Sequence, residues 1–197
     1  MATPLPIENL ASLPKFAMTV VSHEGDKLAF YWDKTGRFEL YVMDLRSRDI
    51  QQITNGQAPK GLRSGFVWTR DDKHIIFGKD NDGDELNNLY ILELATGNTT
   101  QLTDSESQEY AGEVHPDNTF MAVMSNKDGQ MNIYNYNFTD TSWQQLTDFG
   151  APSYAGEWSK DGTWLALSSN ESDNRKNRDA YIVKADGSEL STGGSEF

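Results

Sequence analysis

The stretch that decides the fold is SKDGTWLAL, residues 159–167, in which a polar turn leads into a short apolar run. The same phrase occurs three more times, at residues 22–30, 69–77 and 115–123. Its starting positions, 22, 69, 115 and 159, lie 44 to 47 residues apart. A period of this length indicates a chain built from repeated structural units.

Two further phrases recur in the same order after the first. Each unit continues with a run that contains a tyrosine, at residues 40–45, 89–94, 133–136 and 180–183. The first three units then close on Gln-Ile-Thr or Gln-Leu-Thr, at residues 52–54, 101–103 and 145–147. These runs are short, rich in Tyr, Ile, Val and Phe, and bounded by Gly, Asp and Asn, which is typical of β-strands.

The repeat predicts a β-propeller. With about four strands per period, one unit forms one four-stranded sheet, and such a sheet cannot bury both of its faces alone. Stacking neighbouring sheets buries the faces against each other. We therefore expect an all-β fold, a partial β-propeller of about four blades with four-stranded antiparallel sheets. Three indoles are expected to pack between blades, those of Trp68, Trp158 and Trp164.

The repeat also divides the chain into segments. A lead-in segment is expected at residues 1–15, followed by the partial propeller at 16–190. Its blades are expected near residues 16–56, 57–104, 105–148 and 149–190.

The fourth unit and the end of the chain depart from the repeat. The fourth unit reaches residues 187–190 without its closing Leu-Thr, so its last strand is predicted to be missing. Residues 191–197 do not continue the pattern, and Gly-Ser-Glu-Phe at 194–197 is what two adjacent cloning sites encode. We expect a vector-derived tail on a piece of a longer propeller.

Composition excludes several classes of partner and site. The 197 residues carry a formal net charge of −13, which disfavours binding to nucleic acid or to an anionic membrane surface. The chain has no Cys, which excludes disulfides and thiolate metal sites. Residues 1–20 contain no apolar segment of a secretion signal, so we expect a cytoplasmic protein.

The repeat resembles one that is known from other proteins. Its phrases, clearest at residues 158–166 and 89–103, are similar to the TolB-type propeller repeat. That repeat occurs in TolB and in the propeller of prolyl oligopeptidase family serine peptidases, including acylaminoacyl-peptidases and dipeptidyl peptidases. The resemblance covers residues 16–190, nearly the whole chain.

Two segments favour the peptidase branch of this resemblance. Residues 7–14 are similar to the lead-in before the first blade of those peptidases, and residues 79–90 are similar to a hairpin of their propellers. TolB itself would begin with a signal peptide and an α/β domain, and the sequence shows neither.

The resemblance implies a function. The chain would be the noncatalytic propeller region of a serine peptidase, which gates the access of short peptides to a C-terminal α/β-hydrolase domain. The peptide substrate and that domain are then the expected partners. The alternative is a TolB-like propeller that serves as a protein-binding scaffold and has no enzymatic activity.

The chain itself carries no recognisable catalytic motif. A Gly-x-Ser-x-Gly nucleophile elbow is absent, and His23, His74 and His115 all fall in the repeated turn phrase, which favours a structural or surface role. We therefore expect no catalytic residue and no cofactor in this chain.

Acidic residues form one candidate binding cluster. Asp82, Asp84 and Glu85 lie together in a short loop. The resemblance to dipeptidyl peptidases, whose propeller glutamates capture the free amino terminus of the substrate, makes these three the candidate substrate-binding residues. The loop fails the Ca²⁺-binding pattern of an EF-hand, which needs Gly at position six and Glu at position twelve, so no metal site is expected.

An incomplete propeller leaves sheet faces and strand edges uncovered. Such surfaces favour association with other chains. We therefore expect this chain to associate with itself through its exposed blade edges.

Overall fold

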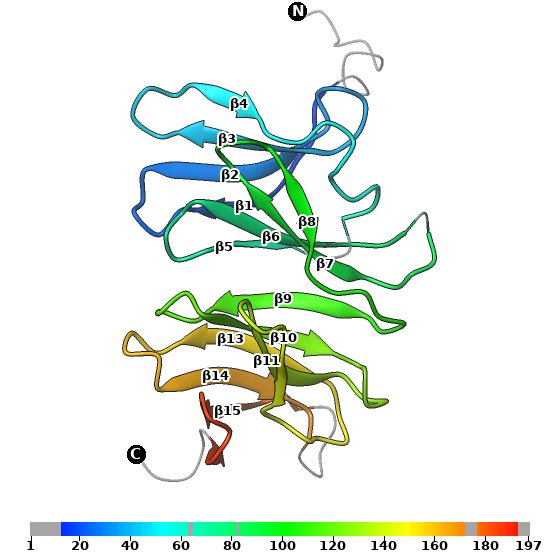
Figure 1. Cartoon of the computed structure of the whole chain (residues 1–197), viewed down its shortest axis with the longest axis vertical. Coiled ribbons are helices and arrows are strands. Elements are labelled where there is room, and N and C mark those ends of the chain that lie inside the picture. Colours follow the sequence, from blue (N-terminus) through cyan, green and yellow to red (C-terminus); the bar gives the residue numbers. More distant parts are fainter. Residues whose placement is uncertain (1–12, 63–64, 82, 172–176, 193–197) are drawn as a thin grey trace, which may run out of the picture. The chain divides into compact units, whose positions relative to one another are not determined.

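The computed structural model describes residues 13–62, 65–81, 83–171 and 177–192. Within these ranges sixteen β-strands form four antiparallel sheets, and no helix occurs (Figure 1). Each sheet takes four strands in chain order, as propeller blades do. The predicted all-β fold with about four four-stranded blades is confirmed. The segment resembling a peptidase lead-in lies almost wholly outside the described residues.

The chain divides into two compact units, residues 1–61 and 62–197. The first unit holds blade 1, whose strands follow one another through tight turns. These strands are β1 (Phe16–Val21), β2 (Lys27–Trp32), β3 (Glu39–Asp44) and β4 (Ile50–Gln52).

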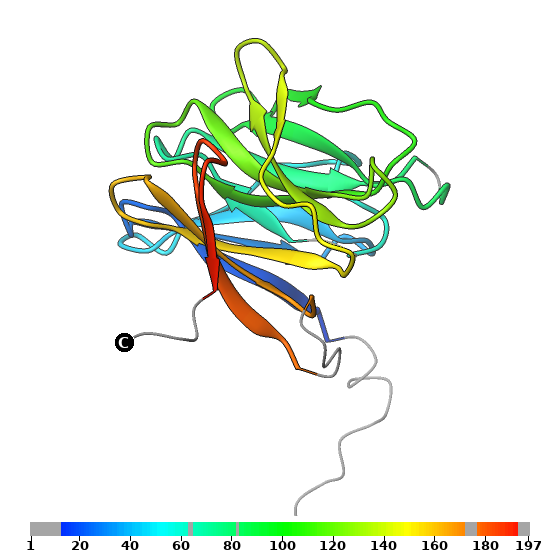
Figure 2. The ribbon, with the colours of Figure 1, turned by 90° about the horizontal axis from the view of Figure 1, so that it is seen from below.

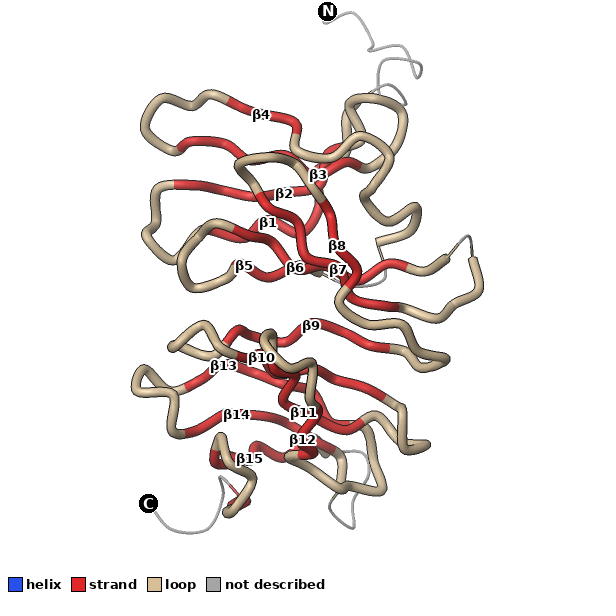
Figure 3. The backbone as a smooth tube through the Cα atoms, viewed as in Figure 1, coloured by secondary structure: helices blue, strands red, loops and turns tan. Residues whose placement is uncertain are grey.

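The second unit holds the other three blades, whose strands are red in Figure 3. Blade 2 consists of β5 (Phe66–Trp68), β6 (His74–Lys79), β7 (Asn88–Glu93) and β8 (Thr99–Gln101). Blade 3 consists of β9 (Glu109–Val114), β10 (Phe120–Ser125), β11 (Asn132–Asn137) and β12 (Trp143–Gln145). Blade 4 consists of β13 (Ser153–Trp158), β14 (Trp164–Ser169), β15 (Asp179–Lys184) and β16 (Leu190–Thr192).

Blade 4 corrects one detail of the prediction. Its fourth strand is present, since β16 pairs with β15 through Leu190 opposite Val183 and Thr192 opposite Tyr181. The strand forms without the Gln-Leu-Thr phrase because pairing uses main-chain groups, which every residue except proline supplies. Figure 2 shows the twist of this sheet, in orange and red.

The Gln-Leu-Thr phrase closes a blade by side-chain hydrogen bonds. In blade 3, the Ile133 amide donates to Thr147 Oγ1 at 2.9 Å, and the Thr147 hydroxyl donates to Asn132 Oδ1 at 2.8 Å. Gln145 Nε2 donates to the carbonyl oxygen of Thr147 at 2.8 Å. A hydroxyl side chain suits this position because one group must accept from an amide and donate to a side chain.

The same closure recurs in the two preceding blades. Thr54 accepts from the Leu40 amide and donates to the buried carboxylate of Glu39. Thr103 accepts from the Leu89 amide and donates to Asn88 Oδ1. A repeated structural task thus explains this repeated phrase.

The Ser-x-Asp-Gly turn is also a hydrogen-bonded unit. In blade 4, the Ser159 hydroxyl donates to Asp161 Oδ1 at 2.6 Å, and the Thr163 amide donates to the same oxygen at 3.0 Å. The Gly162 amide donates to the Ser159 carbonyl oxygen at 2.8 Å. The hydrogen bonds from Ser159 and Thr163 lower the pKa of the Asp161 carboxyl to about 2, so this carboxylate stays ionised and holds the turn at neutral pH.

Blade 3 is packed on both faces. Strand β9 contacts strands of blade 2 on one side and β13 of blade 4 on the other. Met121 and Val123 join Ile76 and Leu89 of blade 2 in one core. Ala122 and Ile133 join Leu165 and Val183 of blade 4 in a second core. Alternate residues of β10 thus serve opposite faces, as the two-residue period of a strand requires.

The three indoles take different places. Trp158 packs between blades 3 and 4, with its ring centroid 5.7 Å from that of Phe120, as the sequence predicts. Trp68 is buried in β5. Trp164 lies on the opposite face of β14 from the core residue Leu165, beside the Lys184 ammonium of its own sheet.

We predict that Gly162→Ala destabilises the protein by about 2–4 kcal/mol. Gly162 has a positive φ of 75°, and an added Cβ would overlap the His115 ring of blade 3. Chemical denaturation measures the loss.

Gly25→Ala is the matched control. Gly25 holds the same turn position in blade 1 with a φ of 70°, but a Cβ there meets nothing within 4 Å. This variant should lose only about 1–2 kcal/mol, the cost of the left-handed backbone. Equal losses in the two variants would refute the contact between Gly162 and His115.

Candidate functional site

A pocket of about 510 Å³ lies in the second unit, where the strands β9 and β13 begin. Its lining carries no charged side chain, although the whole chain is strongly acidic. Such a pocket suits an apolar group held by a few polar contacts. The residues that line it are Gly65, Gln108, Tyr110, Ala111, Met124, Met131, Pro152 and Tyr154.

Polar groups lie at two places along the pocket lining. Tyr110 donates its hydroxyl proton to Gln108 Oε1 at 3.4 Å, and Gln108 Nε2 donates to the Glu85 carbonyl oxygen at 3.4 Å. On the other side, the Arg178 guanidinium lies 4.2 Å from the centroid of the Tyr154 ring. The Gln108 amide thus links the pocket to the acidic loop that the sequence singles out.

The acidic candidates have distinct environments. Asp84 Oδ1 accepts hydrogen bonds from the Asn81 and Leu86 amides, so this carboxylate holds its own turn. Glu85 is exposed and has a positive φ of 63°, and its carbonyl oxygen faces Gln108. Asp82 lies outside the described residues. Asp84 and Glu85 therefore lie near the rim of the pocket, and substrate binding by the three acidic residues stays a prediction.

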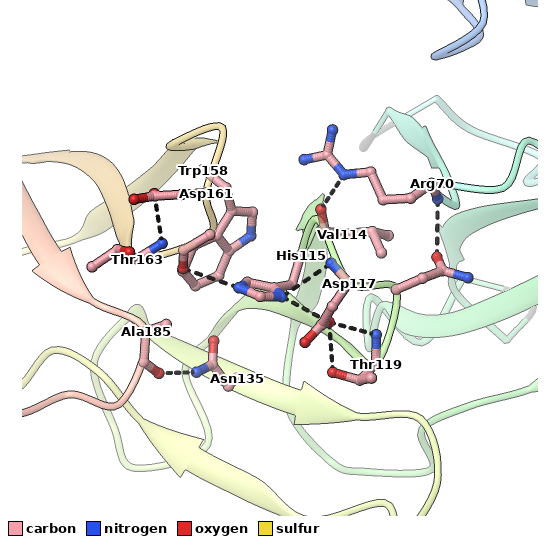
Figure 4. Close-up of polar contacts among 12 residues, drawn as sticks. Arg70, Val114, His115, Asp117, Thr119, Asn135, Trp158, Asp161, Thr163 and Ala185 are labelled. Atoms are coloured by element: carbon pink, nitrogen blue, oxygen red, sulfur yellow. Dashed lines mark hydrogen bonds and ion pairs between the residues drawn. The ribbon is translucent and has the colours of Figure 1, made fainter.

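A second polar cluster joins the three blades of this unit (Figure 4). Arg70 of blade 2 forms an ion pair with Glu113 Oε1 of blade 3 at 2.7 Å. Arg70 Nε also donates to the Val114 carbonyl oxygen at 2.8 Å. The other carboxylate oxygen of Glu113 accepts from the main-chain amide of Trp158 in blade 4 at 2.7 Å.

His115 belongs to this cluster and has a structural role, as the sequence predicts. Its Nδ1 lies 2.7 Å from Asp117 Oδ1, and its Nε2 lies 3.0 Å from the Gly162 carbonyl oxygen of blade 4. The ring stacks on Phe120 at 4.2 Å between centroids. Nε2 therefore contacts blade 4 across the joint, while Nδ1 contacts a residue of the blade 3 turn.

The sequence analysis expected Trp158 at this joint but missed Glu113, the residue that binds its main-chain amide. The segment Tyr-Ala-Gly-Glu occurs at residues 110–113 and again at 154–157, 44 residues later. In each copy the Gly-Glu pair lies in a β-bulge of the blade's first strand. A Cβ on Gly112 would lie 2.8 Å from the Ala122 carbonyl oxygen, so the strands approach too closely for another residue. The second occurrence of Tyr-Ala-Gly-Glu was the sequence signal that could have identified these residues.

Glu109, at the start of β9 between the pocket residues Gln108 and Tyr110, is a buried carboxylate that does not line this pocket. Its side chain is 1% exposed, and Oε1 accepts from the Ser105 hydroxyl at 2.7 Å. Burial raises the pKa of this carboxyl, and hydrogen bonds from Thr103 and Ser105 together with the Lys127 charge offset only part of the rise. Among the described residues, no three His, Asp or Glu gather into a set that could hold a metal ion.

Comparisons with known proteins bear on the fold. No protein-family model matches the sequence, and no curated protein matches it. TolB from Acinetobacter baumannii is similar in structure, with a TM-score of 0.74 and 23% identity over 90% of this chain and 43% of TolB.

Two further solved structures are enzymes. A prolyl endopeptidase matches with a TM-score of 0.66 and 16% identity, over 93% of this chain and 29% of its own. Oligogalacturonate lyase from Vibrio parahaemolyticus matches with a TM-score of 0.68 and 14% identity, over 89% of this chain and 51% of its own. At these identities the likeness shows the propeller fold, and this chain spans about half or less of each protein.

No helix among the described residues is long and apolar enough to span a membrane.

We predict that Glu109→Gln is more stable than the wild type at pH 7. A carboxyl with a raised native pKa holds its proton more tightly in the folded state, so its stabilising contribution is lost as the pH rises above 4.5. Glutamine has the charge of the protonated form at every pH. Urea denaturation at pH 7 and at pH 4 should show a difference that disappears at the lower pH.

Glu106→Gln is the control, because Glu106 is exposed in the loop before β9. It should change stability little at either pH. Equal stability of wild type and Glu109→Gln at pH 7 would contradict the assignment of Glu109 as a destabilised ionised group.

Proposed function

We propose that this chain is the noncatalytic propeller region of a cytoplasmic serine peptidase and gates the access of short peptides to an α/β-hydrolase domain. The uncharged pocket at the start of β9 and β13 carries the proposal, since it offers an apolar lining with the Gln108 amide at its edge. The fold likeness to a prolyl endopeptidase supports the same reading. Peptides would pass this surface on their way to the hydrolase domain.

The residues of this chain indicate which roles it would have and which the hydrolase domain would have. The sequence contains no nucleophile elbow, and His115 is committed to Gly162 and Asp117. The chain would therefore supply walls and binding groups, and the hydrolase domain would supply the nucleophile. Glu85, near the pocket rim, is the acidic side chain best placed to attract the amino terminus of a peptide.

A TolB-like scaffold is the second candidate function. The TM-score of 0.74 with TolB favours it, and an apolar pocket also suits capture of a protein segment. In that case loops on one face bind a partner and no hydrolase domain is involved.

The native reading frame beyond residue 190 separates the two candidates. Further blades followed by a domain with Gly-x-Ser-x-Gly would support the peptidase proposal. A stop codon soon after the last blade, with no such domain, would refute it and leave the scaffold.

In the full-length enzyme, we predict that Glu85→Gln raises KM for peptides with a free amino terminus about tenfold or more, because a charge-assisted hydrogen bond is lost. Acetylated peptides should show no change. Glu24→Gln, an exposed glutamate in the first turn of blade 1, is the control. Identical kinetics of the Glu85 variant and the wild type would remove the amine-binding role.

A further inference from the structure

A second pocket, of about 380 Å³, lies between blades 3 and 4 of the second unit. It shares no lining residue with the uncharged pocket. Three of its lining side chains are amides, those of Asn135, Asn137 and Gln144, and we therefore call it the amide pocket.

The pairing of β11 with β12 brings the three amides to one face of blade 3. Asn135 and Asn137 are two residues apart in β11, so their side chains lie on the same face. Gln144 is paired with Asn135 across the two strands and shares that face. Ile133, two residues before Asn135, belongs to the core that blade 3 forms with blade 4. The three amides therefore lie on the side of blade 3 that meets blade 4.

The main chain of blade 4 fixes how two of these amides are oriented. Asn135 Nδ2 donates to the Ala185 carbonyl oxygen at 2.7 Å (Figure 4), and Gln144 Nε2 donates to the Asp186 carbonyl oxygen at 2.6 Å. An amide turned over would place its own oxygen against a carbonyl oxygen, and neither group can donate. The side-chain oxygens of Asn135 and Gln144 therefore remain as acceptors.

Asn137 is held in the opposite sense by its own turn. Its Oδ1 accepts from the main-chain amides of Thr139 at 2.8 Å and Asp140 at 3.3 Å. Its Nδ2 therefore remains as a donor. Within the part of the chain that the structure describes, no group bonds to this nitrogen or to the side-chain oxygens of Asn135 and Gln144. The amide pocket thus presents two free acceptors and one free donor.

The Asn135 oxygen is the group that points most clearly to a ligand. Asn135 is 6% exposed, and its Oδ1 is buried without a hydrogen-bond partner among the described residues. Figure 4 shows this oxygen on the side of His115, which also lines the amide pocket. Buried polar atoms in folded proteins nearly always have a partner, so an orphaned one calls for an explanation. A ligand in the pocket would supply the missing donor.

The rest of the lining limits the chemistry of that ligand. Phe120 and His115, whose rings stack at 4.2 Å between centroids, form an aromatic wall. The lining contains the Asp186 carboxylate and no Lys or Arg, so an anionic ligand is disfavoured. A hydroxyl group both donates and accepts, and the C–H groups of a sugar ring can pack on the negative face of an aromatic ring.

We propose that the amide pocket binds a neutral sugar. One hydroxyl donates to Asn135 Oδ1, a second donates to Gln144 Oε1, and a sugar oxygen accepts from Asn137 Nδ2. The C–H face of the sugar packs against Phe120. An extended peptide also carries donors and acceptors, but a pocket near the small end of the range for ligand sites suits a compact molecule. The inference does not rest on the proposed peptidase role.

Nuclear magnetic resonance of the side-chain amide groups tests the binding in the 197-residue chain. The probes are glucose, galactose, mannose and N-acetylglucosamine, each at millimolar concentration, and a tripeptide with both ends blocked. We expect at least one sugar to shift the side-chain amide signals of Asn135, Asn137 and Gln144, and the peptide to shift none of them. No shift of these signals by any of the four sugars, or a shift by the peptide alone, would overturn the proposal.

Asn137→Asp tests the recognition without disturbing the turn. Aspartate keeps the oxygen that holds the turn, as Asp44 does in blade 1, where its Oδ1 accepts from the Arg46 and Ser47 amides at 2.8 Å each. It replaces the free donor by an oxygen, so the dissociation constant of the sugar should rise about tenfold or more. Asn98→Asp, at an exposed position of blade 2, makes the same change of charge and should leave the affinity unchanged. Equal affinity of the Asn137 variant and the wild type would refute the site.

Deoxy analogues of the bound sugar test the contact with Asn135. Removing the hydroxyl that donates to Asn135 Oδ1 leaves this buried oxygen unpaired in the complex. One singly deoxygenated analogue should therefore bind about tenfold or more weakly than the parent sugar. A set of such analogues that all bind as tightly as the parent would contradict the assignment.

Discussion

A four-stranded sheet with two apolar faces is not stable alone, so each blade must pack against its neighbours. In the second unit, one carboxylate connects the middle blade to the blades on both sides. Glu113 contacts Arg70 of blade 2 with one oxygen and the Trp158 amide of blade 4 with the other. Around it, blade 3 gives alternate residues of β10 to the two neighbouring cores. The pocket lies where β9 and β13 begin, and these are the two strands that Glu113 and Trp158 connect.

Much of the fold could be predicted because each recurring phrase performs one local task. Thr147 and its equivalents close a blade with a hydroxyl, and Asp161 and Gly162 shape a turn. Such tasks depend on a few neighbouring residues and leave a visible period. The strand β16 was missed because main-chain pairing needs no particular side chains.

The site was less predictable, because its contacts join residues far apart in the sequence. Arg70 and Glu113 are 43 residues apart, and no local pattern pairs them. The acidic loop could be located from its composition, but its composition does not show that the Asp84 carboxylate accepts amides of its own turn. The repeated Tyr-Ala-Gly-Glu segment was a usable signal, because a glycine between alternating residues of a strand marks a close backbone approach.

The functional account separates what the fold provides from what a hydrolase domain would add. TolB, a prolyl endopeptidase and oligogalacturonate lyase share this fold at low identity, so the propeller alone does not define an activity. The feature of this chain on which the functional account depends is an uncharged pocket in an acidic protein, with the Gln108 amide and two tyrosines in its lining.

The hydrogen bond that links blades 3 and 4 can be tested at a single main-chain amide. Hydrogen exchange of the Trp158 main-chain amide, compared between the wild type and Glu113→Ala, reports directly on the bond that links them. The account predicts slow exchange in the wild type and rapid exchange in the variant, while the amides of the β10–β11 ladder remain protected. Equally slow exchange of the Trp158 amide in both proteins would contradict it.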